Sequence, residues 1–199
     1  GNVPIGGGAP VSVQSMTNVP MIDGPDGLWL DVEGNLAQIE RLASAGCEIV
    51  RVAIPNRASI VRFGEVARMS PLPVVADVHF DYQIAVGACH EHAAGLRINP
   101  GNIGAMNKVD AVIEAAGEAG IPIRIGVNAG SLEDALAARD DLTQAEKLAL
   151  SAEGFVEHFR ERDFADIVVS AKAHDVMTTV NAYRSLSQSL PEVPLHIGV

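Results

Sequence analysis

Polar and charged side chains recur at the ends of short β-branched runs in this sequence, and their types suit the binding of anions. A turn and a segment of helical spacing follow each run, so each run is predicted to be a strand. Residues two apart along a strand share a face. This rule places four cations and four other polar residues near the carboxyl ends of the expected strands: Arg51, Arg97, Arg124, Lys172, Asp77, His79, Asn99 and Asn128.

The four cations come from four different expected strands, so they converge on one volume if all of them face inward. A buried cation without a partner costs too much free energy to be kept for packing alone. Each cation could instead pair with a local carboxylate or point outward, but four at matched positions favour a site for several anionic groups. One arginine guanidinium group can bind two phosphate oxygens at once, and a lysine adds a point charge. The expected ligand therefore carries more than one phosphate.

Two neighbouring features fit the same interpretation. Gly101 and Gly104 would let backbone N–H groups approach an anion just before a helix begins, although such a loop is also ordinary turn chemistry. Asp77 and His79 form an acid–imidazole pair that could orient substrate hydroxyls, relay a proton or bind a metal. No third metal ligand is evident, so we expect hydrogen bonds to substrate and assign neither a metal ligand nor a catalytic residue within this chain.

Seven strands that alternate with helices are expected to hold these residues, at 11–16, 49–53, 74–78, 95–98, 123–127, 167–170 and 195–198. Such alternation indicates parallel βαβ units, and seven in a row favour a TIM-type (β/α)8 barrel over an open sheet. A whole barrel needs about 250 residues. This α/β chain has 199 residues, so we expect residues 1–199 to form an incomplete barrel domain, truncated after the seventh strand, of a longer protein.

Three local expectations concern the connections and the cysteines. Segment 18–32, which holds the only tryptophan, is either an ordinary surface loop or a partial lid over the pocket. Ser131 and Asp134 have the spacing of a capping box that opens the helix after the fifth strand. Cys47 and Cys89 are expected to be buried as small apolar side chains, because two cysteines make neither a disulfide framework nor a four-cysteine metal site.

Composition and charge narrow the class of protein. Hydrophobic residues make up 48% of the chain and charged residues 20%, which is typical of a packed domain rather than a disordered one. A net charge of -11 argues against binding to nucleic acid or to an anionic membrane surface. No apolar run approaches the ~20 residues of a membrane span, and no signal peptide is visible. We expect a soluble cytoplasmic protein that binds neither nucleic acid nor membranes.

Six blocks of sequence, in this order, carry a resemblance to a known family: VPIGGGAPVSVQSMT, IVRV, ADVHFDY, LRINPGNIG, IPIRIGVNAGSLE and AKAHDV. Over nearly the whole chain they closely resemble the 4-hydroxy-3-methylbut-2-enyl diphosphate synthases of the methylerythritol phosphate pathway of isoprenoid biosynthesis. The resemblance implies a barrel that binds 2-C-methyl-D-erythritol 2,4-cyclodiphosphate. It also implies an iron–sulfur oxidoreductase whose 4Fe–4S cluster opens the ring reductively and expels water, with electrons from ferredoxin or flavodoxin.

The resemblance also assigns roles to residues by motif. It gives the four cations to the diphosphate and the other four polar residues to the rest of the substrate pocket. It implies that the cluster ligands and the C-terminal iron–sulfur domain are absent from this chain, which alone would be inactive. It further implies that the full-length protein is a homodimer, in which one chain's cluster domain covers the other's barrel.

Two other functions compete with this one. A pterin-binding transferase barrel similar to dihydropteroate synthase is one, but its pocket would hold a neutral pterin ring and would not need four cations. The chain could also be a non-catalytic fragment that binds phosphate. The matched cations favour the reductive synthase.

Overall fold

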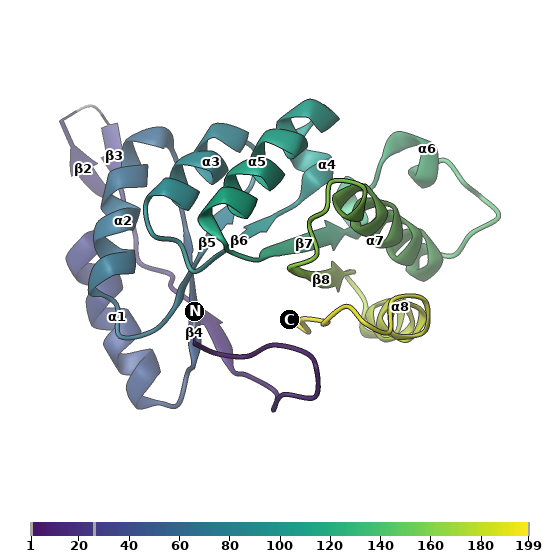
Figure 1. Cartoon of the computed structure of the whole chain (residues 1–199), viewed down its shortest axis with the longest axis horizontal. Coiled ribbons are helices and arrows are strands. Elements are labelled where there is room, and N and C mark those ends of the chain that lie inside the picture. Colours follow the sequence, from purple (N-terminus) through teal and green to yellow (C-terminus); the bar gives the residue numbers. More distant parts are fainter. Residues whose placement is uncertain (1, 26, 199) are drawn as a thin grey trace.

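The computed structural model describes residues 2–25 and 27–198, and its centre is a six-stranded parallel sheet. The strands, in their order across the sheet, are β1 (Gln14–Met16), β4 (Ile49–Ala53), β5 (Val74–Val78), β6 (Gly95–Ile98), β7 (Ile123–Asn128) and β8 (Ile167–Lys172). Each of these strands pairs with the next along the chain, as successive βαβ units require. The sheet curls, and the helices cover its outer face (Figure 1). The fold is therefore an incomplete TIM-type barrel, as the sequence predicts.

The connections contain eight α-helices within the described residues: α1 (Val32–Ser44), α2 (Ile60–Met69), α3 (Tyr82–His90), α4 (Pro100–Ile103), α5 (Met106–Ala119), α6 (Asp134–Ala137), α7 (Gln144–Arg160) and α8 (Val176–Ser189). Two 3-10 turns accompany them, η1 (Arg57–Ser59) and η2 (Ala129–Ser131). Aspartate side chains accept hydrogen bonds from backbone N–H groups at the starts of three helices. The accepting residues are Asp31 at α1, Asp81 at α3 and Asp175 at α8. Such caps satisfy donors that a helix start leaves unpaired.

The core lies between the outer face of the sheet and the helices. Alternate strand residues pack into it and are almost fully buried: Val50, Val52, Ala76, Val78, Ile98, Ile123, Ile125 and Val169. The residues between them face the opposite side of the sheet, which is the interior of the barrel. This alternation turns the charged residues of the strands inward, so the predicted parity is confirmed.

The expected seventh strand, 195–198, is wrong. The chain there makes one isolated parallel bridge, between Val169 and Leu195. Backbone bonds run from Val169 N to Pro194 O (2.9 Å) and from His196 N to Val169 O (2.8 Å). The ladder stops at Leu195, because the Ala171 N–H and the His196 carbonyl, which would continue it, both bond to the Tyr183 hydroxyl instead. The first strand is also shorter than expected, at three residues.

Segment 18–32 forms an antiparallel hairpin of β2 (Ile22–Gly24) and β3 (Gly27–Trp29). The hairpin is held against the start of α2. Asn56 Nδ2 donates to Leu28 O (2.7 Å), Arg62 Nε donates to Leu30 O (2.7 Å), and the Arg62 guanidinium lies 5.0 Å from the Trp29 ring centre. None of its described residues lines the pocket of the candidate site. This arrangement favours the surface connection over the lid.

The expected capping box at Ser131 and Asp134 is wrong. Ser131 ends η2, and α6 begins at Asp134 with no cap from a described side chain, because the chain first makes a tight turn after β7. A capping box is found later, where Thr143 and Glu146 cap the start of α7 reciprocally.

The two cysteines are free and buried, as expected. Burial raises the pKa of the Cys89 thiol to about 12, so this side chain is an inert packing residue. None of the helices in the described part of the chain combines the length and the apolar character that crossing a bilayer requires.

Candidate functional site

An open cavity of about 610 Å³ lies inside the curl of the sheet, at the carboxyl ends of the strands. Active sites of TIM-type barrels are built at this face. Seven of the eight residues that the sequence proposes for a site line the cavity: Arg51, Asp77, His79, Arg97, Arg124, Asn128 and Lys172. The other lining residues are Gln14, Ser15, Met16, Ser170, Ala171, Tyr183, His196, Ile197 and Gly198.

Asp77 is the centre of this arrangement. Asp77, Arg97 and Arg124 are register partners on the adjacent strands β5, β6 and β7, so their inward side chains form one row. The Asp77 carboxylate is 2% exposed. Its Oδ1 lies 3.4 Å from Arg97 Nη1, and its Oδ2 lies 3.4 Å from Arg51 Nε and 3.5 Å from His79 Nε2. One carboxylate thus faces two guanidinium groups, and the cluster retains an excess of positive charge.

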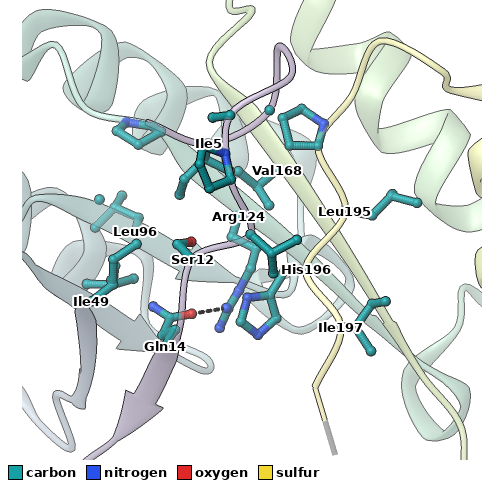
Figure 2. A pocket seen from close by; sticks show the side chains of 18 residues that line it. Ile5, Ser12, Gln14, Ile49, Leu96, Arg124, Val168, Leu195, His196 and Ile197 are labelled. Atoms are coloured by element: carbon teal, nitrogen blue, oxygen red, sulfur yellow. Dashed lines mark hydrogen bonds between the residues drawn. The ribbon is translucent and has the colours of Figure 1, made fainter. Parts of the chain in front are cut away.

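Arg124 is the most buried of these cations, at 6% exposure. Its Nη1 donates to Gln14 Oε1 over 2.6 Å, which connects β7 to β1 across the barrel interior (Figure 2). Burial, helped by the positive charges of Arg51 and Arg97, lowers the pKa of Arg124 to about 10. Burial also lowers the pKa of Arg97. A bound anion would therefore offset the free-energy cost of burying these charged guanidinium groups.

Two donors in the cluster have no hydrogen-bond partner among the described residues. Arg97 Nε and Arg124 Nε are both buried and unbonded there. A buried donor without a partner costs about 1–3 kcal/mol, and such groups are rare in folded proteins. Both side chains line the cavity, so a bound anion there would offset the charge of these guanidinium groups.

Arg51 has an unusually weak acceptor. Its Nη2 and Nε lie 3.0 Å and 3.3 Å from the sulfur atom of Met16. A thioether accepts hydrogen bonds poorly, so Nη2 remains available to a stronger acceptor, whereas Nε also faces the Asp77 carboxylate.

Three further predicted residues lie at the rim of the cavity. His79 is half-exposed, Lys172 is exposed, and Asn128 is partly buried. Asn128 and Lys172 are register partners on β7 and β8, so their side chains lie beside each other. The rim adds one more cation and two groups that can bond to hydroxyls or phosphates.

Asn99 is the exception among the predicted residues, because it does not line the cavity. Strand β6 ends at Ile98, and Asn99 is the N-cap of α4. Its Oδ1 accepts from Gly101 N (3.1 Å), and its Nδ2 donates to Ser131 Oγ (2.7 Å). The Gly101 N–H is therefore already bonded, and the glycine loop does not offer it to an anion. Contact of Asn99 with a ligand stays a prediction.

His196 and Tyr183 also belong to the cavity, although neither is among the eight residues proposed from the sequence. The His196 ring lies beside the Arg124 side chain (Figure 2). Burial, and then the charges of Arg124, Arg51 and Arg97, lower the pKa of His196 to about 4. The Tyr183 hydroxyl donates to His196 O and accepts from Ala171 N (3.1 Å), which holds this segment against β8. No local pattern in the sequence predicts where the Tyr183 hydroxyl points.

A second cavity of about 400 Å³ lies toward the amino ends of the strands (Figure 2). Its walls are mostly apolar and come from the segment before β1, from the sheet and from residues 194–197. Four residues line both cavities and separate the apolar space from the cationic one: Gln14, Arg124, His196 and Ile197.

The described residues do not fit an iron–sulfur cluster. They contain no group of three or more His, Cys, Asp or Glu side chains placed to hold a metal ion. Such clusters are held chiefly by cysteine thiolates, and both cysteines here are buried outside the cavity. The cationic side chains that line the cavity are instead of the type that suits an anion.

The fold and the cavity define a barrel domain of the TIM type with a cationic pocket at the carboxyl ends of its strands. The chain belongs to the GcpE TIM-barrel domain family, whose model matches residues 1–199. This confirms the family that the sequence blocks indicated.

Curated relatives agree with the family match. Over its whole length the chain is 47% identical to the 4-hydroxy-3-methylbut-2-en-1-yl diphosphate synthase (flavodoxin) of Chromohalobacter salexigens and 49% identical to that of Geobacter sulfurreducens. It covers 51% and 54% of those proteins. The chain therefore spans about half the length of the curated relatives it matches.

Solved structures show the same barrel in another family. The dihydropteroate synthase of Yersinia pestis matches with a TM-score of 0.60 at 16% identity, over 92% of this chain and 68% of that one. The same enzyme in complex with a sulfonamide drug gives 0.64 at 15% identity, over 92% and 72%. At such low identity the likeness shows the fold alone.

Proposed function

We propose that this chain is the substrate-binding barrel of a reductive synthase that converts 2-C-methyl-D-erythritol 2,4-cyclodiphosphate to 4-hydroxy-3-methylbut-2-enyl diphosphate. The observation that carries the proposal is the row of inward arginines around one carboxylate, with buried Nε groups that lack a partner in the described part of the chain. A ligand with two linked phosphates supplies the negative charge and the oxygen acceptors that this row lacks. The names of the relatives support the same substrate class.

In this proposal the residues of the cavity bind and orient the substrate. Arg51, Arg97 and Arg124 contact phosphate oxygens, and Lys172 adds charge at the rim. Asp77 orients the guanidinium groups of Arg51 and Arg97 and accepts a hydrogen bond from a substrate hydroxyl. The half-exposed His79 and the rim residue Asn128 bond to the remaining polar groups of the substrate.

The reductive half of the reaction belongs, in this proposal, to the rest of a longer protein. We assign the 4Fe–4S cluster to a C-terminal domain outside residues 1–199, and the electrons to flavodoxin, which the names of the relatives print, or to ferredoxin. The full-length protein is proposed to be a cytoplasmic homodimer that binds neither nucleic acid nor membranes.

A pterin-binding transferase remains the second candidate, because dihydropteroate synthases share the fold. A neutral pterin ring would leave the arginine row without a counter-charge, which makes this candidate the weaker one. A non-catalytic phosphate-binding fragment is the third.

Calorimetric titration separates these candidates. We expect the chain to bind the cyclodiphosphate with an affinity that falls as salt is added, and to show no measurable binding of a pterin. Binding of a pterin but not of the cyclodiphosphate by the folded chain would overturn the proposal. A turnover assay of a full-length protein that contains this barrel separates the synthase from a fragment that only binds phosphate.

A further inference from the structure

The Arg97 guanidinium lies directly against the backbone of β7 at Gly126. A Cβ atom placed on Gly126 would lie 2.7 Å from Arg97 Nε, 2.7 Å from Nη2 and 3.0 Å from Cζ. These three atoms are the nearest heavy atoms to that position, and Cβ contacts under 3.0 Å essentially never occur. An alanine at this position would therefore collide first with the charged head of Arg97.

Backbone conformation does not explain the glycine. Gly126 lies inside the regular ladder of β7, where it is the register partner of Ser170 on β8. Its φ is not in the positive region that disfavours other residues. A glycine in the middle of a strand weakens the strand and often marks a place where another group approaches closely. Here the group that approaches is a ligand-facing guanidinium.

The close approach decides where Arg97 points. With its head against β7, Arg97 directs Nη1 toward Asp77 Oδ1 (3.4 Å) and keeps in the interior an Nε that has no partner among the described residues. Its side chain is only 12% exposed, so Arg97 is enclosed on most sides. A head pushed off Gly126 has to move toward the cavity, where it would occupy space needed by a ligand.

We propose that Gly126 is a positioning residue, whose missing side chain holds Arg97 in the geometry that binds an anion. The inference rests on the proposed function to the extent that Arg97 is taken as a ligand of a phosphate group. Restoring an ordinary contact distance would move the guanidinium by roughly half an ångström or more. Shifts of this size are enough to impair a preorganised site.

The first test is the Gly126→Ala variant, with inorganic pyrophosphate and the cyclodiphosphate as probes in calorimetric titrations. We expect the dissociation constants to rise by about tenfold or more, because the guanidinium no longer meets the ligand in the same geometry. Gly130→Ala is the matched control, because a Cβ on Gly130 meets no described atom within 4 Å. This control should bind both probes as the original chain does. Unchanged binding by Gly126→Ala would overturn the inference.

A double-mutant cycle with Arg97→Ala separates positioning from a general structural role. Once the guanidinium is removed, Gly126→Ala should cause no further loss of affinity, since nothing remains for its methyl group to displace. Equal losses in both backgrounds would refute the inference. If Gly126→Ala does not fold, the double variant should restore folding, and failure of both variants to fold would also refute it.

A crystal structure of Gly126→Ala keeps the test independent of the proposed function. If the original chain binds neither probe, the proposed function fails, but the position of Arg97 can still be compared. We expect its guanidinium to be displaced from β7 while the strands stay in place. A guanidinium that keeps its original position in the Gly126→Ala variant would overturn the inference.

Discussion

Arg51 and Arg97 share the carboxylate of Asp77, and the adjacent Arg124 donates to the neutral Gln14, so the arginine row carries more positive than negative charge. Each guanidinium has a donor without a strong acceptor: Arg51 Nη2 donates to a thioether sulfur, and the Nε atoms of Arg97 and Arg124 have no partner within the described chain. The cost of burying these groups is hard to explain by packing alone. It is explained if the site is preorganised for an anion.

Replacing one of these arginines tests the assignment most directly. Arg97→Ala should weaken binding of the cyclodiphosphate by about 30- to 150-fold, which corresponds to ~2–3 kcal/mol for a charge-assisted contact. Calorimetry measures the change. Arg57→Ala is the control, because Arg57 pairs with Asp81 at the surface and does not line the cavity. Wild-type affinity in Arg97→Ala would remove Arg97 from the binding site.

The depressed pKa of His196 predicts how stability depends on pH. Its folded-state pKa is about 4, against an ordinary value of 6.5, so the unfolded chain binds more protons at this residue between those values. The contribution of His196 to the free energy of unfolding should be full above pH 6.5 and decrease as the pH falls toward 4. Denaturant unfolding of the original chain and of His196→Gln over this range measures the difference. Parallel pH profiles of the two proteins would contradict the prediction.

An anion in the cavity should reverse the part of that pKa shift that comes from the arginine charges. A bound diphosphate offsets the charges of the arginines that face His196, so the pKa of the ring should rise and a proton should be taken up on binding. Nuclear magnetic resonance titration of the His196 ring, with and without pyrophosphate, measures both values. An identical titration curve in both states would show that no anion sits near the ring.

At the scale of elements, the parallel strands carry the site and the connections hold its edges. The register of β5, β6 and β7 aligns the central charges, while the bridge at Val169 and Leu195 brings His196 to the open side. Tyr183 on α8 joins these parts, because its hydroxyl bonds to β8 and to the last described segment. The Tyr183 hydroxyl therefore helps to fix the position of His196, which lines the cavity but lies outside α8.

Removal of that hydroxyl should loosen the segment. Tyr183→Phe leaves the Ala171 N–H and the His196 carbonyl without this partner, at a cost of about 1–3 kcal/mol of unfolding free energy. Hydrogen exchange at the amide of His196, which donates to Val169 O, should become faster. Ser187→Ala on the exposed side of the same helix should leave that exchange rate unchanged. The prediction fails if the exchange rate does not change in Tyr183→Phe.

At the scale of the whole molecule, a chain with a net charge of -11 concentrates cations at one face of its barrel. The proposed binding residues lie on or just after strands within residues 1–199, and no described group of side chains fits a metal cluster. The relatives named as synthases are about twice as long as this chain. Substrate binding and reduction are therefore assigned to different parts of the proposed full-length enzyme.

This separation predicts a chain that binds substrate without converting it. Incubated with iron and sulfide under anaerobic conditions, residues 1–199 should develop no cluster absorbance, and they should show no turnover with dithionite as reductant. Calorimetry on the same sample should still detect the cyclodiphosphate. Turnover by this chain alone would refute the assignment of the two halves.

Much of the fold follows from short-range pattern. The sequence pattern predicts the bounds of β4, β5 and β6 correctly, because β-branched runs and turn residues act locally. Side-chain alternation along each strand also predicts that four residues face one volume, since alternation needs no knowledge of the partner strand. These residues are Arg51, Asp77, Arg97 and Arg124.

Contacts between residues distant in the sequence were decided only by the tertiary structure. The row of Asp77, Arg97 and Arg124 depends on the register between strands, and the contact of Arg97 with Gly126 depends on how two strands lie side by side. Side-chain alternation along β6 predicts that Asn99 faces the cavity with Arg97. Asn99 instead caps α4 and bonds to Ser131, because the strand ends at Ile98. These outcomes depend on free energies of packing and hydrogen bonding that arise only when separate segments meet.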